Sequence, residues 1–272
     1  MKKKKDVRGK VFLVTGGAMG IGRMVAERFA RDGARVVLWD VDSKALEETA
    51  SHMKDMGWEV HHHVVDVTDR SKVYETAERV KDEVGKVDVL FNNAGIIRGG
   101  AFLEVDDEDH FKTVDVNFNA YMWTTKAFMP DMVERNRGHI INIASSAGLS
   151  YVPLCADYCA SKAAVVMFTD ALRLEMKKLG HRGVRFTIVC PGLVTTGLFE
   201  GAKTPLLVAW MTPDKIADKI YEGYHRDREM VAEPLMVKLS PLLRGITTRK
   251  IYDVMSTMVG LSRTMDEWRG RG

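Results

Sequence analysis

The 272-residue sequence contains only three cysteines, carries little excess charge and has no long apolar run. Cys155, Cys159 and Cys190 form neither a C-x-x-C pair nor an even set, which favours reduced thiols in a cytoplasmic setting. A net charge of +3 without a basic, aromatic-rich stripe argues against nucleic-acid binding. No apolar segment approaches the ~18 residues of a membrane span, and no signal-peptide core is present, so we expect no transmembrane segment.

What remains is an ordinary globular composition with one charged run. Hydrophobic residues make up 46% and charged residues 28% of the chain, and no linker or repeat divides it, which predicts one domain over residues 1–272. The lysines at positions 2 to 5 exceed the whole positive excess. We expect residues 1–8 to form a solvated basic tail, with peripheral contact to a lipid surface as the alternative.

A glycine-rich turn follows the first apolar run, Lys10–Thr15, and leads into a helical pattern that stops at Asp32-Gly33. Glycine lets the backbone approach a pyrophosphate, which then lies on the N–H groups of the helix N-terminus. The sequence therefore predicts a dinucleotide site. Its spacing is G-x-x-x-G-x-G, not the commoner G-x-G-x-x-G, and it is formed by Gly16-Gly17-Ala18-Met19-Gly20-Ile21-Gly22.

An acidic residue, Asp40, closes the second predicted strand, 35–39. At this position a carboxylate bonds the adenosine ribose hydroxyls and repels a 2′-phosphate. Neither Met19 nor Val41, which flank the expected 2′-phosphate position, is basic. We therefore predict NAD rather than NADP. The other interpretation of Asp40, a cap for the next helix, suits Asp42 or Ser43 better.

Apolar runs of strand length alternate with amphipathic helical stretches through most of the chain. This predicts an α/β protein with one Rossmann-type, doubly wound parallel sheet, right-handed crossovers and helices on both faces. One long helix is expected over about 106–135 and another to about 179. The glycine turn and several polar residues follow strand ends, which predicts one shared site. The expected strands are 10–15, 35–39, 59–65, 87–91, 140–143, 184–189 and 229–233.

A run of three histidines, His61–His63, is the one pattern typical of a metal site. It falls in a predicted strand, where neighbouring side chains point to opposite faces. No other histidine, cysteine or acid lies at ligand spacing. We therefore predict no bound metal.

Tyr158 and Lys162 are four residues apart in a predicted helix, so they stack on one face. A lysine cation beside a tyrosine favours the phenolate and lowers the phenol pKa, which makes Tyr158 a proton-transfer group. Ser145 follows the Ile140–Ile143 run and would present its hydroxyl to the same pocket. A lone Y-x-x-x-K occurs by chance on surface helices, so this pattern depends on its context.

The last part of the chain has a different pattern. We expect a substrate lid over about 197–228 and an amphipathic, methionine-rich extension over about 235–272, with Ser240-Pro241 restarting a helix. Such a stripe fits core or a subunit interface, an adaptable lid over an apolar substrate, or a lipid contact. The pocket-forming stretches, about 149–155 and 197–211, are apolar, which favours a lipophilic alcohol or ketone.

Taken together, these motifs resemble the short-chain dehydrogenase/reductase family over roughly residues 8 to 235. The resemblance rests on the glycine turn, Asn92-Asn-Ala-Gly95, Tyr158-Cys-Ala-Ser-Lys162 and Pro191-Gly192…Thr196. It implies that Tyr158 is the general acid/base, that Lys162 binds the nicotinamide ribose and lowers the tyrosine pKa, and that Ser145 orients the substrate. It also implies that Asn117 supports a water relay, with Asn119 as the other candidate.

The same resemblance assigns the cofactor contacts. Asp40, Asp66, Val67 and Asn93 would hold the adenosine half, and Val194 and Thr196 the carboxamide. The implied NAD-binding residues are Gly16, Met19, Gly20, Ile21, Gly22, Asp40, Asp66, Val67, Asn93, Ala94, Gly95, Tyr158, Lys162, Pro191, Gly192, Val194 and Thr196.

The tail from Val259 to Arg271 resembles the C-terminus of a branch that acts on retinoids, steroids and long-chain alcohols. We therefore expect an NAD-dependent oxidoreductase that interconverts a lipophilic, secondary alcohol and its ketone or aldehyde, as a homo-oligomer, dimer or tetramer. The alternative is a non-catalytic dinucleotide-binding sensor or scaffold. Loss of the tyrosine, lysine or serine would mark that alternative, and all three are present.

Overall fold

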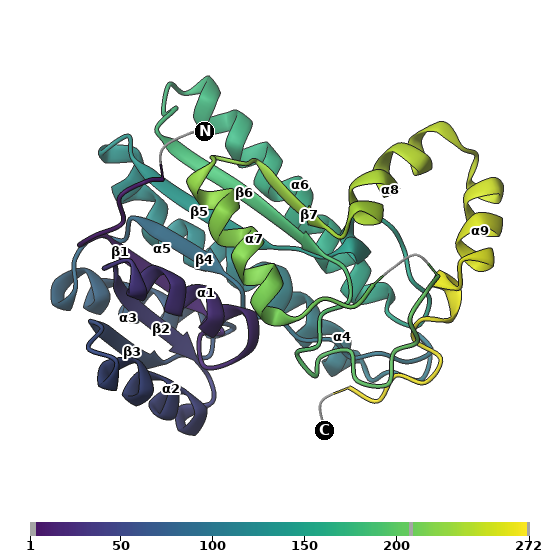
Figure 1. Cartoon of the computed structure of the whole chain (residues 1–272), viewed down its shortest axis with the longest axis horizontal. Coiled ribbons are helices and arrows are strands. Elements are labelled where there is room, and N and C mark those ends of the chain that lie inside the picture. The colour runs from purple at the N-terminus through teal and green to yellow at the C-terminus, as the bar shows by residue number, and fades with distance from the viewer. Residues whose placement is uncertain (1–3, 207–208, 271–272) are drawn as a thin grey trace.

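A computed structural model describes residues 4–206 and 209–270 (Figure 1). Over this part of the chain, one sheet of seven parallel strands has the order β3-β2-β1-β4-β5-β6-β7. The predicted strands are confirmed, with ends shifted by one or two residues in most cases. They are β1 Val11–Thr15, β2 Arg35–Asp40, β3 Val60–Val64, β4 Val89–Asn92, β5 Gly138–Ile143, β6 Val184–Pro191 and β7 Met230–Glu233.

Helices cover both faces of the sheet, which confirms the predicted doubly wound α/β fold. The expected long helix over 106–135 is interrupted by a π-helical turn at Asp115–Asn119, so it forms two helices instead of one. Such turns are frequent at functional sites. The helices between the strands are α1 Gly20–Arg31, α2 Ser43–Asp55, α3 Arg70–Glu83, α4 Asp107–Val114, α5 Ala120–Glu134, α6 Ala156–Lys178 and α7 Pro213–His225.

The expectation of right-handed crossovers throughout is wrong for the connection from β6 to β7. Its helix, α7, shares a face of the sheet with α1, where Arg28 pairs with Asp214 and Asp218 at 2.7 Å each. In the strand order, the step from β1 to β2 runs toward β3, whereas the step from β6 to β7 runs away from it. Because the helices of both connections cover the same face, the two connections have opposite hands. On the other face, α5 places Phe128 against Trp39.

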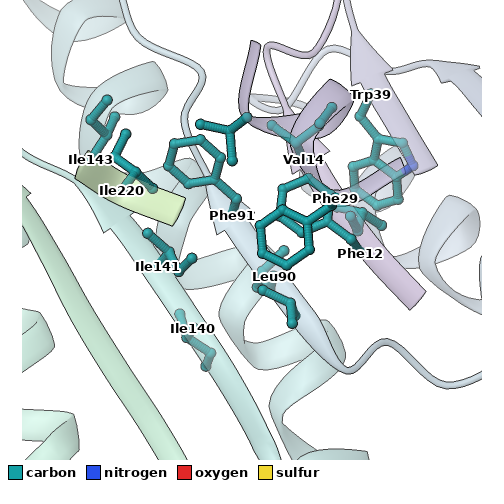
Figure 2. Packing of buried hydrophobic residues seen from close by; sticks show 14 of the residues in the cluster. Phe12, Val14, Phe29, Trp39, Leu90, Phe91, Ile140, Ile141, Ile143 and Ile220 are labelled. Atoms are coloured by element: carbon teal, nitrogen blue, oxygen red, sulfur yellow. The ribbon is translucent and has the colours of Figure 1, made fainter. Parts of the chain in front are cut away.

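Aromatic side chains fill the layers beside the central strands (Figure 2). Phe12 of β1 stacks on Phe29 of α1 with ring centroids 4.0 Å apart, and Phe91 of β4 lies beside them. Each central strand is buried on both faces, as expected for a parallel sheet between helix layers. This packing fixes the carboxyl ends of β1 and β4 relative to each other, and the site lies at those ends.

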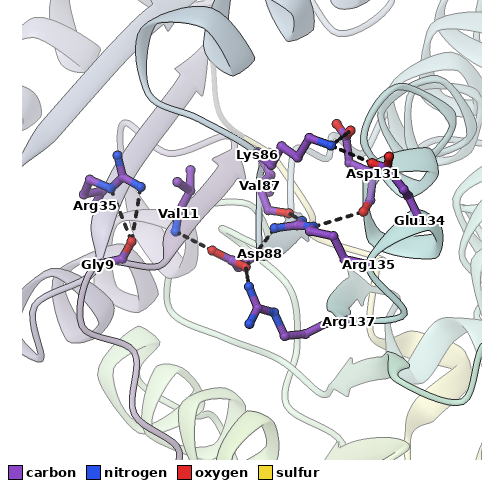
Figure 3. A network of polar contacts seen from close by, with 10 residues as sticks. All are labelled: Gly9, Val11, Arg35, Lys86, Val87, Asp88, Asp131, Glu134, Arg135 and Arg137. Atoms are coloured by element: carbon purple, nitrogen blue, oxygen red, sulfur yellow. Dashed lines mark hydrogen bonds and ion pairs between the residues drawn. The ribbon is translucent and has the colours of Figure 1, made fainter.

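A polar network holds the opposite, amino-terminal edge of the sheet (Figure 3). The Asp88 carboxylate accepts the backbone N–H of Val11 at 3.1 Å and pairs with Arg135 at 3.2 Å and Arg137 at 3.6 Å. Arg35 donates to the carbonyl of Gly9. These contacts tie the start of β1 to the segment before β4 and so support the register of the two strands.

Part of the N-terminal basic run is bound to the folded chain, contrary to the expected solvated tail. Lys4 pairs with Asp32. The Lys5 backbone N–H donates to His225 Nδ1 at 3.0 Å, and its ammonium pairs with Asp227. Acidic and aromatic partners from distant parts of the chain decide this placement. The first two lysines of the run lie outside the described residues.

The C-terminal extension forms two further helices, α8 (Leu235–Ile246) and α9 (Arg249–Met258), followed by a short turn at Leu261–Arg263. Figure 1 shows α8 and α9 projecting from the sheet beside the end of β7. Pro241 lies inside α8 and does not restart a helix there. The Val237 carbonyl, which proline leaves without its helical partner, accepts the Ser240 hydroxyl at 3.0 Å, so α8 continues.

Candidate active site

The glycine-rich turn after β1 leaves no room for larger residues. Gly16 and Gly20 have φ values of +65° and +58°, which favour glycine. A Cβ on Gly22 would lie 2.1 Å from the Gly16 carbonyl oxygen. The Asn93 side chain donates to the carbonyls of Thr15 and Gly16, each at 3.0 Å. Asn93 therefore braces the turn from the end of β4.

A cavity of about 450 Å³ lies beyond the carboxyl ends of the strands, where the strand order reverses between β1 and β4. This position is the usual ligand crevice of open parallel sheets. Gly22 packs against the Gly16 carbonyl, and Asn117 bonds the backbone of Ile96, which is itself in the wall, so neither residue lines the cavity. The predicted residues that do are Gly16, Met19, Gly20, Ile21, Asp40, Asp66, Val67, Asn93, Ala94, Gly95, Ser145, Tyr158, Lys162, Pro191, Gly192, Val194 and Thr196.

These residues fit a dinucleotide. The N-terminus of α1 faces the glycine turn, and its first turn carries no acidic residue, so its positive end suits a phosphate group. Asp40 lines the cavity while accepting the backbone N–H of Ala18 at 3.0 Å. Asp42, not Asp40, caps α2 by accepting the Ala45 N–H at 3.0 Å. The capping role expected for Asp42 is thus confirmed, and the carboxylate of Asp40 lies in the cavity wall.

Two basic side chains of the cavity wall, Arg98 and Lys112, did not enter the sequence prediction. Arg98 follows Gly95 closely and pairs with Asp109 of α4 at 3.2 Å. Its place just beyond the N-A-G segment could have suggested it. Lys112 is an exposed residue of α4 with no distinguishing sequence signal. Only the packing of α4 beside the cavity brings it there.

Tyr158 and Lys162 lie on the same face of α6, as predicted, and are 3% and 2% exposed. The Lys162 Nζ atom lies 5.8 Å from the centre of the Tyr158 ring and 5.4 Å from that of Tyr121. It donates to the Ile143 carbonyl at 3.1 Å. The end of β5 therefore fixes the lysine head beside the tyrosine.

The pKa values of this pair shift in the direction set by burial. Burial lowers the pKa of Lys162 to about 7. Burial also raises the pKa of Tyr158 above its ordinary value, and a hydrogen bond with Ser145 opposes that rise. The net shift at Tyr158 is therefore upward, opposite to the lowered tyrosine pKa that we expected. Removal from water disfavours the charged form of each group, and this sets the direction of both shifts.

Ser145 follows β5 and is 4% exposed. Its hydroxyl accepts the Ala147 N–H at 3.1 Å, which starts a short turn over Ser146–Gly148. A Cβ on Gly148 would lie 2.6 Å from the carbonyl oxygen of Lys162. This close approach of the turn to the α6 backbone keeps Ser145 beside the part of α6 that carries Tyr158.

Asn117 lies in the π-helical turn and is fully buried. Its side chain accepts the Ile96 N–H and donates to the Ile96 carbonyl, both at 2.9 Å, and it donates to Ser161 at 3.2 Å. Asn119, the other relay candidate, bonds Asp115 within the same turn. Of the two, Asn117 is the one that joins the loop after β4 to α6.

A second cavity of about 180 Å³ adjoins the first and is mainly apolar. Ser145, Tyr158, Gly192 and Phe199 line both cavities. The walls of the second come largely from the C-terminal extension and the loop after β6. They include Pro205, Leu206, Met236, Val237, Leu243, Tyr252, Met255, Val259, Leu261, Thr264 and Met265.

The described residues form neither a membrane-spanning helix nor a metal-binding cluster. None of the helices there is both long and apolar enough to cross a bilayer. In the same part of the chain, no cluster of three histidines, cysteines or acids is placed to hold a metal ion. His62 instead contacts Glu47 at 2.8 Å, while His63 is buried.

The strand order, the braced glycine turn and the buried serine, tyrosine and lysine define an oxidoreductase of the Rossmann type. A model of the short chain dehydrogenase family matches residues 10–205, and the chain belongs to this family. It is an enzyme of the class that acts on CH–OH groups. This membership argues against the alternative of a non-catalytic sensor or scaffold.

Similar proteins cover almost the whole chain. Estradiol 17-beta-dehydrogenase 11 of Mus musculus is 37% identical over 260 residues, which are 96% of this chain and 87% of that protein. Epidermal retinol dehydrogenase 2 of Homo sapiens is 38% identical over 268 residues, 97% and 87% of the two chains. A short chain dehydrogenase/reductase from Burkholderia phymatum, solved in complex with NAD, has a TM-score of 0.82 at 27% identity and covers 95% and 98%.

Proposed function

We propose that this enzyme is an NAD-dependent dehydrogenase that interconverts a lipophilic, mainly secondary alcohol and its ketone or aldehyde. One observation carries the proposal: Ser145 and Tyr158 stand where the polar cavity beyond the strand ends meets the apolar cavity under the C-terminal extension. A dinucleotide fits the first cavity and an apolar molecule fits the second. Their reacting ends would meet at these two hydroxyl groups.

The chain supplies position and proton transfer in this mechanism. Ser145 holds the alcohol oxygen, and the Tyr158 oxygen takes the hydroxyl proton during oxidation or returns it during reduction. When bound, NAD supplies the nicotinamide that exchanges a hydride with the carbinol carbon. Protonated Lys162 stabilises the phenolate and binds the ribose hydroxyls. The buried site excludes water, so these charge interactions are stronger than in solvent.

The preference for NAD is proposed from the wall of the larger cavity. Asp40 lies there with Met19 and Val41, and none of these three provides a cation for a 2′-phosphate. Asp66 and Val67 border the same end, while Val194 and Thr196 belong to the nicotinamide end by family resemblance. The similar structure from Burkholderia phymatum was solved with NAD, which supports the choice.

The substrate class is proposed from the smaller cavity. Its polar side chains carry hydroxyl groups and no charge, while apolar side chains, mainly of leucine, methionine and valine, form most of its wall. Apolar pockets with few polar groups select lipophilic ligands. Estradiol and retinol, the molecules after which two of the relatives are named, are lipophilic alcohols.

An alcohol panel with NAD and NADP side by side tests the proposal through NADH or NADPH absorbance. We expect turnover of lipophilic secondary alcohols with NAD, and loss of turnover in Tyr158→Phe with NADH binding retained. Normal turnover in that variant would remove Tyr158 from its role. Binding of NADH without turnover of any alcohol by the unaltered enzyme would restore the sensor or scaffold alternative.

We also propose a cytoplasmic enzyme that contacts an anionic lipid surface through α8 and α9. Leu206, 68% exposed, and Met255, 37% exposed, line the apolar cavity, so its mouth opens at this surface. Exposed Arg249 and Lys250 supply positive charge. The three free thiols support a reducing compartment. The exposed apolar residues are Leu235, Leu239, Leu242, Ile246, Ile251, Val254, Met255 and Met258.

Co-sedimentation with phosphatidylserine vesicles tests this contact. We expect binding that weakens as salt rises and is lost in Leu242→Asp. A matched variant, Leu103→Asp, changes a residue that is 94% exposed but lies in the loop after β4, and it should bind like the unaltered protein. Concentration-dependent dimers or tetramers without vesicle binding would assign the face to the predicted homo-oligomer instead.

A further inference from the structure

The C-terminal segment 259–269 is fastened along the loop that follows β6. Leu206 N–H donates to the Val259 carbonyl at 2.7 Å, and Lys203 N–H donates to the Thr264 carbonyl at 2.8 Å. Figure 1 shows this yellow segment running beside the green loop. Unlike α8 and α9, which expose apolar side chains, the segment buries Thr264 and Met265 to 3% and 5% exposure.

Trp268 holds the end of this segment between two loops of the site. Its indole N–H donates to the Leu198 carbonyl at 3.1 Å in the loop after β6. Its ring rests on Gly99 in the loop after β4, where an added Cβ would lie 2.8 Å from the ring. Gly201, with φ +82°, similarly lies against the backbone of Glu267. The absence of side chains at both glycines makes room for the segment.

Met265 reaches the reacting end of the apolar cavity. It packs in one buried cluster with Ile97, Cys155 and Tyr158. It also lines the cavity that Ser145 and Tyr158 share. The segment thus brings a large, flexible side chain into the buried cluster and the cavity wall to which Tyr158 also belongs.

We propose that Met265 is a specificity-determining residue of the substrate pocket and that Trp268 is the positioning residue that holds it there. The ligand class is an apolar alcohol whose hydroxyl end lies at Tyr158 and whose body passes Met265 toward the space between α8 and α9. The methionine side chain sets how wide that body is beside the carbinol carbon. This inference rests on the proposed function and names the residue that limits its substrates.

The first experiment compares kcat/KM for a fused-ring secondary alcohol with that for a short straight-chain one. Met265→Ala should raise this ratio about tenfold by removing bulk from the wall, with NADH affinity unchanged. Met265→Leu, similar in volume, and Asp266→Ala, an exposed neighbour, should keep the original ratio. A ratio in Met265→Ala equal to that in Asp266→Ala would overturn the assignment of Met265.

The second experiment displaces Trp268 without removing it. Gly99→Ala places a methyl group against the indole, so KM for the fused-ring alcohol should rise several-fold while kcat changes little. In a double-mutant cycle, the same change in a Trp268→Ala background should add nothing, because its target is gone. Additive effects would refute the positioning role. If Trp268→Ala fails to fold, Trp268→Phe, which keeps a ring but loses the bond to Leu198, takes its place in the cycle.

A binding measurement separates this inference from the proposed function. The fluorescent fused-ring phenol 2-naphthol, which cannot be oxidised to a ketone by hydride transfer, serves as an analogue of the alcohol. It is titrated into each variant in the presence of non-fluorescent NAD and followed by its emission. Met265→Ala should change its Kd about tenfold and Asp266→Ala should not, whether or not the protein oxidises any alcohol. If the unaltered protein turns over no alcohol, the proposed function is wrong. If Met265→Ala and Asp266→Ala bind naphthol with equal affinity, Met265 does not limit the width of the pocket.

Discussion

At the scale of single residues, the site is governed by burial more than by pairwise attraction. Tyr158 and Lys162 are adjacent as the sequence predicts, yet burial raises the pKa of the tyrosine and lowers the pKa of the lysine. In the site without a ligand, the charged forms of Tyr158 and Lys162 are poorly solvated. The hydroxyl groups of a bound ligand can supply part of the missing solvation. Such strained polar groups are typical of functional sites, where stability is given up for activity.

Lys162→Met should therefore stabilise the protein in the absence of ligand while abolishing activity. The folded-state pKa of Lys162 is about 7, below the ordinary 10.5, so between these pH values the folded protein binds fewer protons than the unfolded chain. The unfavourable contribution is full below pH 7 and disappears toward pH 10.5. The Ile143 carbonyl still accepts the Tyr121 hydroxyl at 3.3 Å in the variant.

Urea unfolding at a series of pH values measures this effect. The gain in the free energy of unfolding should be about 2 kcal/mol or more below pH 7 and should decline as the pH rises. Lys112→Met, which removes an exposed lysine of the same cavity wall, is the control and should change little. A gain that is independent of pH would show that the charge of Lys162 is not its cause.

At the scale of elements, the ends of β4 and β5 are joined to α6 by buried side-chain amides and hydroxyls. Asn92 donates to Asn142 at 2.8 Å, and Asn142 donates to Thr169 of α6 at 2.9 Å. Above them, Asn117 joins Ile96 to Ser161. These bonds hold the serine-bearing and tyrosine-bearing elements against the cofactor side of the cavity.

Asn117→Ala should lower the free energy of unfolding by about 1–3 kcal/mol, because it leaves the partly buried N–H and carbonyl of Ile96 without their side-chain partner. It should also weaken NADH binding, since the loop after β4 loses its brace. Denaturant unfolding and calorimetric NADH titration measure the two effects. Asn119→Ala, which loses only a bond to Asp115 within the turn, should have the smaller effect on both. Equal effects would contradict the bracing role.

At the scale of the whole molecule, Lys5 near the start of the chain and the segment 259–269 near its end are both bound to the domain. The Lys5 Nζ atom lies 4.4 Å from the centre of the Tyr224 ring and pairs with Asp227. The buried His139 ring packs against the same tyrosine. Burial lowers the pKa of His139 to about 3, so it stays neutral beside the lysine near neutral pH. The other end covers the apolar cavity.

Lys5→Ala should lower the free energy of unfolding by about 1 kcal/mol at neutral pH, through loss of a half-buried ion pair and a cation–π contact. Burial lowers the pKa of Lys5, which opposes its charge, and burial also opposes charge on Asp227. The hydrogen bond from Lys5 nevertheless leaves the pKa of Asp227 lower than usual and so stabilises the carboxylate. Its contribution is therefore present above the ordinary aspartate pKa of 3.8 and is lost as the pH falls through the folded value.

Urea unfolding of Lys5→Ala and of the exposed α2 variant Lys44→Ala measures this contribution. The difference between Lys5→Ala and the unaltered protein should shrink in acid, and Lys44→Ala should match the unaltered protein. A Lys5→Ala variant of unchanged stability would show that the N-terminal run is solvated, as the sequence suggests.

The sequence alone determined the strands, the glycine turn and the order of polar residues at strand ends, because these depend on short-range periodicity and on the steric limits of glycine. It also placed nearly all the predicted residues around one cavity, since parallel strands end at one edge. Gly22 and Asn117 were predicted by motif, but they act from behind the wall.

Only the tertiary structure decided the face on which α7 packs, the binding of Lys4 and Lys5, and the path that brings Met265 to Tyr158. It also decided the direction of the pKa shifts at Tyr158 and Lys162. Each of these depends on contacts between residues far apart in the chain. Burial in particular is a sum over every neighbour that excludes water, and no local pattern contains that sum.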